Sequence, residues 1–311
     1  MISRSTLVGA LVVVELVIVG AGARAIAGGS PGPMVAEAPF SFGTGSQERV
    51  FSRAPVDRTF ATGIAPRVVI DVHDVDVFVR GENVPTVHVA ESLRKSGYVW
   101  GEVAPLTAQQ SADGIRISTR ANSGVHMVFG SYSRELTVTV PVGAHVEFAS
   151  AGVVDASGLR EKLIAHIPDG AIRIRDHRGD VDVSTGSGRI TMVDVQGDDI
   201  AANTRDGRIY LTRVGADRID ATSSSGRIVG VDVRAVNGAL TTRDGRVILS
   251  FTGNSDATVN VHTADGNVHV SGLSTTQNDE QKSVVHLGSG RGRFEVSTGS
   301  GSITLTQGAN V

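Results

Sequence analysis

Four arginines occupy the same position in a short repeated sequence motif, and their type and spacing suit the binding of anions. They are Arg189, Arg208, Arg227 and Arg246, each directly after a glycine and each 19 residues from the next. If residues 19 apart lie above one another in adjacent strands, their guanidinium groups form a column with a spacing of about 4.8 Å. Guanidinium groups pair well with phosphate and carboxylate, so the column is a candidate contact for phosphate-bearing or acidic cell-wall polymer.

The same arginines also fit an exposed row of turn residues whose charge is balanced by neighbouring acids. Asp206 and Asp244 each precede an arginine of the column by two positions, and Asp265 holds the same place in the next repeat. Because acidic and basic residues interleave, the sequence favours this charge-balanced row over a polymer-binding stripe.

Other residue types that could hold a metal or a cofactor give no site. The chain has no cysteine, which excludes disulfides, thiolate chemistry and cysteine metal sites. Asp206, Asp244 and Asp265 provide one carboxylate per repeat, and the Gly-Gly-x-Gly-x-Asp phrase of calcium-binding solenoids is absent. His262 and His269 are the nearest pair of histidines but have no third ligand. We therefore expect no metal site and no cofactor.

Two short motifs and an enzymatic function are also disfavoured. Arg178-Gly179-Asp180 spells an integrin-type tripeptide that turn geometry and chance explain, and the G-x-S-x-G match at residues 28–32 has no strand before it and no helix after it. Polysaccharide-cleaving β-helices use long loops and aromatic platforms, whereas the turns here are short and Trp100 lies outside the repeats. We expect no catalytic residues.

The arginines belong to a sequence motif that recurs at a nearly fixed period. The glycine of each copy is Gly188, Gly207, Gly226, Gly245, Gly266 or Gly301. The first four glycines are 19 residues apart and the fifth follows after 21. A period near 20 is typical of a solenoid, in which each repeat forms one coil.

Each copy of the motif predicts two short strands that flank a turn. Apolar residues alternate with polar ones on both sides of the glycine, as in Val183 before it and Ile190 after it. A serine or threonine stands three positions before every glycine, and we expect these hydroxyls to bond along a ladder and to nearby backbone. We expect the glycine to form a tight corner with a positive φ.

The predicted fold is all-β: a single-stranded parallel β-helix, right-handed, with coils of about 19 residues, preceded by an N-terminal hydrophobic helix. A β-propeller is the main rival, but its blades need about 40 residues and four strands. The prediction requires Ile190, Ile209 and Ile228 to lie directly above one another.

Three segments are expected along the chain. Residues 1–27 contain an apolar run interrupted by Glu15 and form a transmembrane anchor or a signal segment, of which the anchor is favoured. Residues 28–55 form a flexible Gly/Pro/Ser linker. Residues 56–311 form the solenoid, with an irregular first part (56–145) and regular coils (146–311).

Two places near the C-terminus depart from the repeat. Residues 274–283 break the period and are expected to form a loop bulging from one coil. Residues 302–306 form the last coil, which has no evident cap and offers an open edge for self-association.

The pattern of these segments resembles a known family. The hydrophobic N-terminal segment, the strand end at Val140-Pro141 and the repeated Ser/Thr-x-x-Gly-x-Ile/Val coils are similar to the bacterial DUF4097 family, whose members are often labelled adhesins or β-strand-repeat proteins. The resemblance covers about residues 67–305. It implies an envelope-associated parallel β-solenoid without established catalytic residues.

The expected function is that of a non-enzymatic, membrane-anchored extracytoplasmic scaffold, an adhesin or a cell-envelope binding protein. Its expected partners are an envelope polymer or a surface protein, and the membrane through the N-terminal segment. The alternatives are an envelope-stress or signalling accessory that contacts a membrane partner, and secretion after cleavage of a signal segment. A net charge of −3 gives no overall attraction to nucleic acid.

Overall fold

The computed structural model describes residues 55–100, 103–119, 126–149, 152–234 and 236–308 of the 311-residue chain. The chain divides into two compact units, Met1–Ser46 and Gln47–Val311, and every described residue belongs to the second. The predicted N-terminal helix, with its anchor or signal role, and all but the last residue of the predicted linker lie outside the described residues. Within the described ranges, no helix has the length and apolar character needed to cross a membrane.

The described residues form strands and turns, without helices. In chain order, the strands are β1 (Asp57–Ala61), β2 (Arg67–Asp71), β3 (Asp76–Glu82), β4 (Thr86–Trp100), β5 (Thr107–Ser111), β6 (Gly114–Ser118), β7 (His126–Pro141), β8 (His145–Phe148), β9 (Val154–Ser157), β10 (Leu163–Ile167), β11 (Ile172–Arg178), β12 (Val181–Thr185), β13 (Ile190–Thr204), β14 (Ile209–Ser223), β15 (Ile228–Val233), β16 (Asn237–Thr242), β17 (Val247–Phe251), β18 (Ala257–Asp265), β19 (Val268–Ser271), β20 (Ser274–Asn278), β21 (Lys282–Leu287), β22 (Gly292–Ser300) and β23 (Ile303–Gln307).

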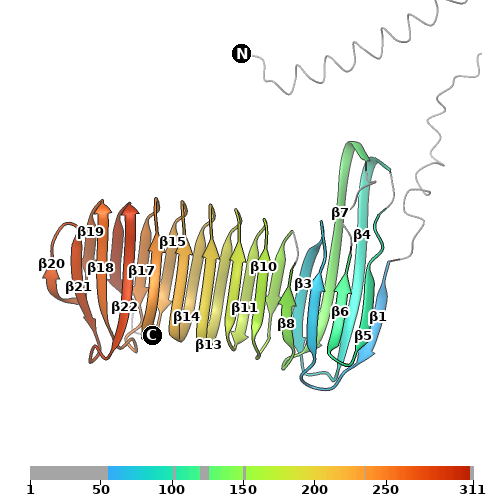
Figure 1. Cartoon of the computed structure of the whole chain (residues 1–311), viewed down its shortest axis with the longest axis horizontal. Helices are drawn as coiled ribbons and strands as arrows, with labels where there is room; N and C mark the ends of the chain where they lie inside the picture. Colours follow the sequence, from blue (N-terminus) through green and yellow to red (C-terminus); the bar gives the residue numbers. More distant parts are fainter. Residues whose placement is uncertain (1–54, 101–102, 120–125, 150–151, 235, 309–311) are drawn as a thin grey trace, which may run out of the picture. The chain divides into compact units, whose positions relative to one another are not determined.

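The sequence repeats stack as parallel coils, which confirms the predicted solenoid. Ile190 in β13 pairs with Ile209 in β14, and Ile209 pairs with Ile228 in β15. Figure 1 shows these strands side by side with β11 and β17. Residues 19 apart therefore lie directly above one another in neighbouring parallel strands, which excludes the propeller. The right-handed sense of the coil stays a prediction.

Each regular coil contributes one strand to each of two sheets. The first sheet runs through β9, β11, β15 and β17, and the second runs through β8, β10, β12 and β16. The long strands β13 and β14 pass through both sheets, bending at a corner where Asp194 and Arg213 have φ values of 57° and 52°. This bend keeps alternate side chains inside the coil on both sheets.

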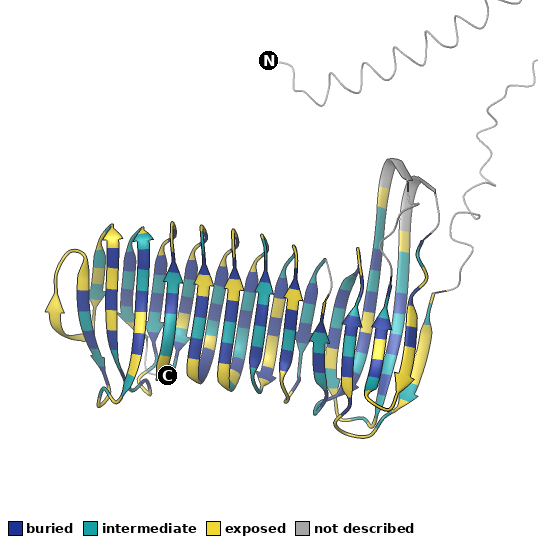
Figure 2. Ribbon diagram, viewed as in Figure 1, coloured by how far each residue is buried: buried dark blue, intermediate teal, exposed yellow. Residues whose placement is uncertain are grey.

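The core is a narrow aliphatic column between the two sheets. Figure 2 shows buried residues alternating with less buried ones along the strands. Ile190, Ile209 and Ile228 are fully buried, as are Val183 and Ala221 on the opposing strands. Burial of a side chain such as Ile contributes about 1.5–3 kcal/mol, and that contribution exists only when the adjacent coils are in place.

Buried hydroxyls fasten each turn to the one beneath it, as the sequence predicts. The Ser223 hydroxyl donates a hydrogen bond to the Gly207 carbonyl (3.1 Å) and accepts one from the Gly226 amide (2.9 Å). Thr204 and Thr242 make the same bond to the glycine carbonyl of the preceding coil. The hydroxyl ladder therefore runs through backbone groups of successive turns.

The turn glycines are required by close packing, and the predicted positive φ is wrong for them. Gly188, Gly207, Gly226 and Gly245 are absent from the residues with positive φ. A Cβ on Gly207 would overlap the carbonyl oxygen of Gly188 in the coil below, and the same holds for Gly226 over Gly207. A side chain is excluded there because successive turns touch through their backbones.

At the C-terminal end the chain folds back between two of its own coils. β22 lies between β16 and β18, and β23 lies between β17 and β19. The predicted open edge at residues 302–306 is therefore wrong, since both sides of β23 are paired. The predicted loop at residues 274–283 is also wrong: β20 forms an antiparallel hairpin with β21, which pairs with β18.

The N-terminal end folds back in a comparable way. β2 lies between β6 and β8, and β3 lies between β7 and β9, all in parallel pairs. Further out, β4 pairs antiparallel with β7 over most of its length, and β1 pairs antiparallel with β4. Residues 126–141 form the single long strand β7.

A buried ion pair fastens this N-terminal end. Arg134 Nη2 of β7 lies 2.7 Å from Glu91 Oε1 of β4, and both side chains are fully buried. Glu91 Oε2 also accepts a hydrogen bond from the Val56 amide (3.0 Å). The pair thus joins the two long strands to the segment that leads into β1.

Candidate functional site

The arginine column, Arg189, Arg208, Arg227 and Arg246, exists as a continuous row. The Ile190 amide donates to the Arg208 carbonyl (2.9 Å), and the Ile209 amide donates to the Arg227 carbonyl (3.0 Å). These bonds place the four arginines at one corner of successive coils, at the start of the strands of the first sheet. All four residues are exposed.

The column lacks the acidic partners that the sequence suggests. Among the described residues, no carboxylate lies within 4.0 Å of any of the four guanidinium groups. Asp206 instead pairs with Arg205 (3.3 Å) and accepts a hydrogen bond from Ser225 (2.6 Å), and Asp244 accepts one from Ser300 (2.9 Å). The aspartates therefore serve the turns, and the positive charge of the column is left for a ligand or for solvent.

At one position the column contacts the outer face of the first sheet. The guanidinium carbon of Arg189 lies 5.6 Å from the centre of the Tyr210 ring in the next coil. Such a cation–π contact is worth about 0.5–1 kcal/mol at an exposed position. Arg189 and the outward-facing side chain of Tyr210 thus belong to one surface.

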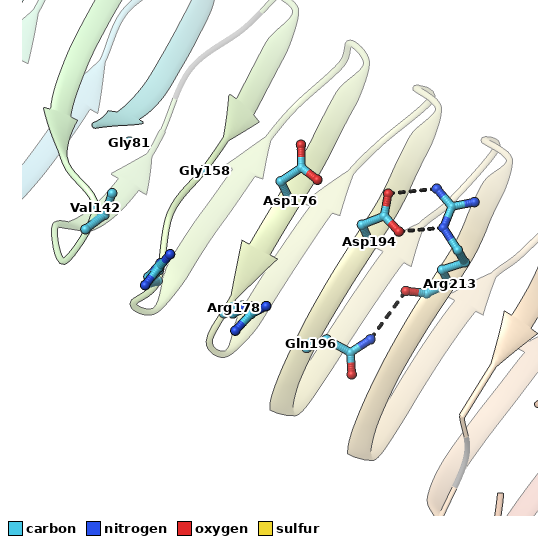
Figure 3. Close-up of a pocket in the computed structure, with 9 residues that line it drawn as sticks. Gly81, Val142, Gly158, Asp176, Arg178, Asp194, Gln196 and Arg213 are labelled. Atoms are coloured by element: carbon cyan, nitrogen blue, oxygen red, sulfur yellow. Dashed lines mark hydrogen bonds and ion pairs between the residues drawn. The ribbon is translucent and has the colours of Figure 1, made fainter. Parts of the chain in front are cut away.

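A separate groove of 560 Å³ follows the corner where the strands bend, and Figure 3 shows its lining. Arg213 forms a two-point ion pair with Asp194, with Nε–Oδ1 at 2.5 Å and Nη2–Oδ2 at 2.7 Å. The hydrogen bonds from Arg213 hold the pKa of the Asp194 carboxyl below its usual range. Arg160 and Arg178 also line this groove and have no carboxylate within ion-pair distance among the described residues. The groove is therefore lined by both acidic and basic side chains, whereas the column contains arginines alone.

The Arg178-Gly179-Asp180 tripeptide belongs to the wall of this groove and to the adjoining turn. Arg178 ends β11, Gly179 has a φ of 141°, and Asp180 Oδ1 accepts a hydrogen bond from the Asp199 amide (3.1 Å). The aspartate is thus used to fasten the neighbouring coil.

Comparison with known proteins places this architecture in a family. The model of the family described as Toastrack DUF4097 matches residues 66–306. The chain belongs to the Toastrack DUF4097 family. No curated protein matches it.

Solved structures of similar proteins share little sequence with this Toastrack chain. A candidate adhesin from Parabacteroides merdae is 10% identical, with a TM-score of 0.46, over 81% of this chain and 95% of its own. A candidate adhesin from Bacteroides fragilis is 10% identical, with a TM-score of 0.45, over 82% of this chain and 98% of its own. A candidate cell adhesion protein from Clostridium sporogenes is 9% identical, with a TM-score of 0.28, over 82% of this chain and 100% of its own.

The Toastrack coils keep the remaining sequence candidates apart. His262 lies on β18 in the second sheet and His269 on β19 in the first, so the two rings are not brought together. No three His, Asp or Glu side chains in the described part of the chain gather closely enough to hold a metal ion. Asp265 belongs to the outer coil, on the far side of β22 from Asp244.

Sequence reasoning missed two features of the Toastrack surface. The groove at the bend depends on left-handed backbone at Asp176, Asp194 and Arg213. Aspartate adopts this conformation more readily than most residues, so Asp176 and Asp194 are an overlooked signal for the bend. The position of Tyr210 beside the column could have been predicted from the sequence, because Tyr210 stands two positions after an arginine of the column. Strand alternation places both side chains outward, on the same face.

Proposed function

We propose that this protein is a non-enzymatic, membrane-anchored extracytoplasmic scaffold, an adhesin or envelope-binding protein, that binds anionic envelope polymer through the arginine column. The solenoid supplies a rigid support on which the same contact recurs once per coil. The observation that carries the proposal is the alignment of four exposed guanidinium groups, none of which has an acidic partner among the residues that the structure describes.

The repetition of the contact is what would make the binding useful. A single exposed pair of charges is worth at most about 1 kcal/mol. Linked contacts on one polymer reinforce one another, because each contact after the first is intramolecular. A column of stacked arginines therefore suits a long ligand with regularly repeated negative charge better than it suits a small anion.

The test is polymer binding at a series of salt concentrations, with immobilised polygalacturonate and inorganic polyphosphate as probes. The variant replaces Arg189, Arg208, Arg227 and Arg246 by Gln. We expect binding of the unmodified protein to weaken as salt rises, and the variant to lose at least about tenfold in affinity and most of its salt dependence.

A matched control removes the same charge from arginines that already have partners. Arg175, Arg213, Arg218 and Arg291 each pair with an aspartate at 2.5–2.6 Å. Their replacement by Gln should change the affinity no more than about twofold, because these side chains are already committed. Equal losses in both variants, or no loss in the first, would overturn the proposal.

The placement of the scaffold has its own test. Protease treatment of intact cells should release a fragment close to residues 56–311 if the solenoid lies outside the membrane and the N-terminal segment remains in it. Recovery of the same fragment from the culture medium without protease would show secretion, and protection from protease would contradict an extracytoplasmic location.

A further inference from the structure

The outer face of the first sheet carries an apolar row directly beside the arginine column. Two residues after each arginine, the outward position is Thr191, Tyr210, Val229 or Ile248. We call Tyr210, Val229 and Ile248 the apolar row; each is only half-buried. Val231, on the same face, is 43% exposed and is one of the two exposed large hydrophobic residues in the described ranges.

The second sheet of the same coils has no such row. Its outward positions hold Asp182, Ala201, Asp220 and Ala239 in one line, and Ser184, Asn203, Thr222 and Thr241 in the next. The repeat therefore does not itself require apolar residues on the outside. In these coils the arginine column and the larger outward-facing apolar side chains both lie on the first sheet.

The size of this face limits what can bind there. Four coils at about 4.8 Å span about 19 Å, and outward positions two residues apart along a strand are about 7 Å from one another. With the arginine column, the face measures about 250 Å². A stable contact between two folded proteins buries about 800 Å² on each side. The face instead fits one narrow, extended chain that lies along the direction of stacking.

We infer that this face binds an acidic polysaccharide whose sugar rings each carry a carboxylate. The carboxylates pair with the arginine column, while the apolar C–H faces of the rings rest on the apolar row. A pyranose ring extends its chain by a length comparable with the spacing of about 4.8 Å between coils, so one ring lies against each coil. This inference rests on the proposed function and specifies its ligand.

The apolar row distinguishes this ligand from other polyanions. Polyphosphate presents oxygen atoms on all sides and gains nothing from contact with Val229 or Ile248. A neutral glucan has apolar ring faces but no charge for the arginines. Only a polymer with both features uses both parts of the face.

The experiment measures the affinity for polygalacturonate, inorganic polyphosphate and neutral dextran at one moderate salt concentration. The test variant is Tyr210→Thr, Val229→Thr and Ile248→Thr, since Thr191 already occupies this row in the preceding coil. The control variant is Val69→Thr and Ile164→Thr, which changes half-buried apolar residues on the outer face of the second sheet. Thermal unfolding confirms that both variants are folded.

We expect the test variant to bind polygalacturonate about tenfold more weakly while it keeps its affinity for polyphosphate and its salt dependence. The control variant should bind as the unmodified protein does, and dextran should not bind. Unchanged polygalacturonate binding in the test variant, or equal losses on both charged polymers, would overturn the inference.

Two further variants keep the outcomes distinct. If the Arg→Gln column variant loses both charged polymers while the apolar-row variant loses neither, the proposed function stands and this inference fails. If the column variant keeps both polymers, the proposed function fails as well. Arg160→Gln with Arg178→Gln should leave binding unchanged, and a loss there would move the site to the groove and overturn the inference.

Discussion

Val247 and Val268 are separated in the stack by Ile303, which pairs with both of them. The coil that comes last in the sequence therefore lies inside the solenoid, and the coil before it lies outside. Parallel pairing on both sides satisfies the backbone of β23, while the hairpin of β20 and β21 covers the end of the second sheet. The order of coils in space thus differs from their order in the chain.

Engineered disulfides test this order of coils, and the absence of cysteine from the chain makes the test clean. Thr304 pairs with Ile248 on one side and with His269 on the other. Adjacent parallel strands place Cα atoms about 4.8 Å apart, within the range of a disulfide. We expect Ile248→Cys with Thr304→Cys to form a cross-link under mild oxidation, seen as a shift in non-reducing electrophoresis.

The control for that experiment joins the two flanking coils. Ile248→Cys with His269→Cys places the sulfur-bearing residues two strand spacings apart, about 9.6 Å, which is beyond the reach of a disulfide. A cross-link in this control, together with none in the first pair, would show that the coils stack in sequence order.

Substitution of Gly207 by Ala should destabilise the protein strongly. The new Cβ would overlap the Gly188 carbonyl, and relief requires separation of two coils at their turn. We expect a loss of about 2–4 kcal/mol in the free energy of unfolding, measured by urea denaturation. Gly63→Ala is the comparison, because its Cβ meets nothing within 4 Å and the cost of its φ of 87° is about 1 kcal/mol. Equal effects at both positions would refute the backbone contact as the reason for Gly207.

Substitution of Ser223 by Ala should cost about 1–3 kcal/mol, because it leaves the buried Gly226 amide without its acceptor. Ser225, two positions on, is exposed, and its hydroxyl donates a hydrogen bond to Asp206 at the surface. Ser225→Ala should therefore change the free energy of unfolding by no more than about 0.5 kcal/mol. The two variants differ by position alone, so similar losses would argue against the hydroxyl ladder.

The protein should become less stable as the pH falls below about 6.5, and buried His177 is one cause. Burial lowers the pKa of His177 below 6.5, although the backbone of Asp180 acts in the opposite direction. The unfolded chain takes up a proton near pH 6.5 while the buried ring does not, so stability is complete above that pH and is lost as the pH falls. The size of this loss is at most about 1.4 kcal/mol per pH unit.

His177→Val gives the measurement, since the equivalent positions in the next two coils are Val195 and Val214. The urea concentration at the midpoint of unfolding should decrease as the pH is lowered from about 7.5 to 5, and this decrease should be smaller in the variant than in the unmodified protein. Part of the slope should remain, because burial also lowers the pKa of His145, helped by Arg67. The lowered pKa values of the Asp194 and Asp256 carboxyls, the latter about 2, act below this window. Parallel curves for the two proteins would contradict the role of His177.

The stacking of coils could be predicted because one residue type recurs at one position of each coil. Ile190, Ile209 and Ile228 share both a spacing and a chemical character, and a shared position in a coil follows from that. The arginine column follows by the same argument, since each arginine precedes one of these residues.

The order of the end coils could not be predicted in this way. A repeated motif shows which position within a coil a residue occupies, but it does not show which coils are neighbours. Gly245, Gly266 and Gly301 occupy the same position, and the sequence alone does not tell whether Gly266 or Gly301 lies next to Gly245. The only signal is the change of spacing from 19 to 21 and then 35 residues, which reflects the added hairpin. The partners of Asp206 and Asp244 depend on which serine lies above them, and this also requires the three-dimensional register.

The folding back of the chain at both ends has a consequence for how such a molecule can lengthen. Since β2 and β3 are held between neighbours at one end, and β22 and β23 at the other, new material cannot be appended outside them without rebuilding a terminus. Duplication of an inner unit, such as the 19 residues from Ile190 to Arg208, disturbs neither end. The number of arginines in the row, and so the reach of the binding face, can grow by tandem insertion in the middle of the gene.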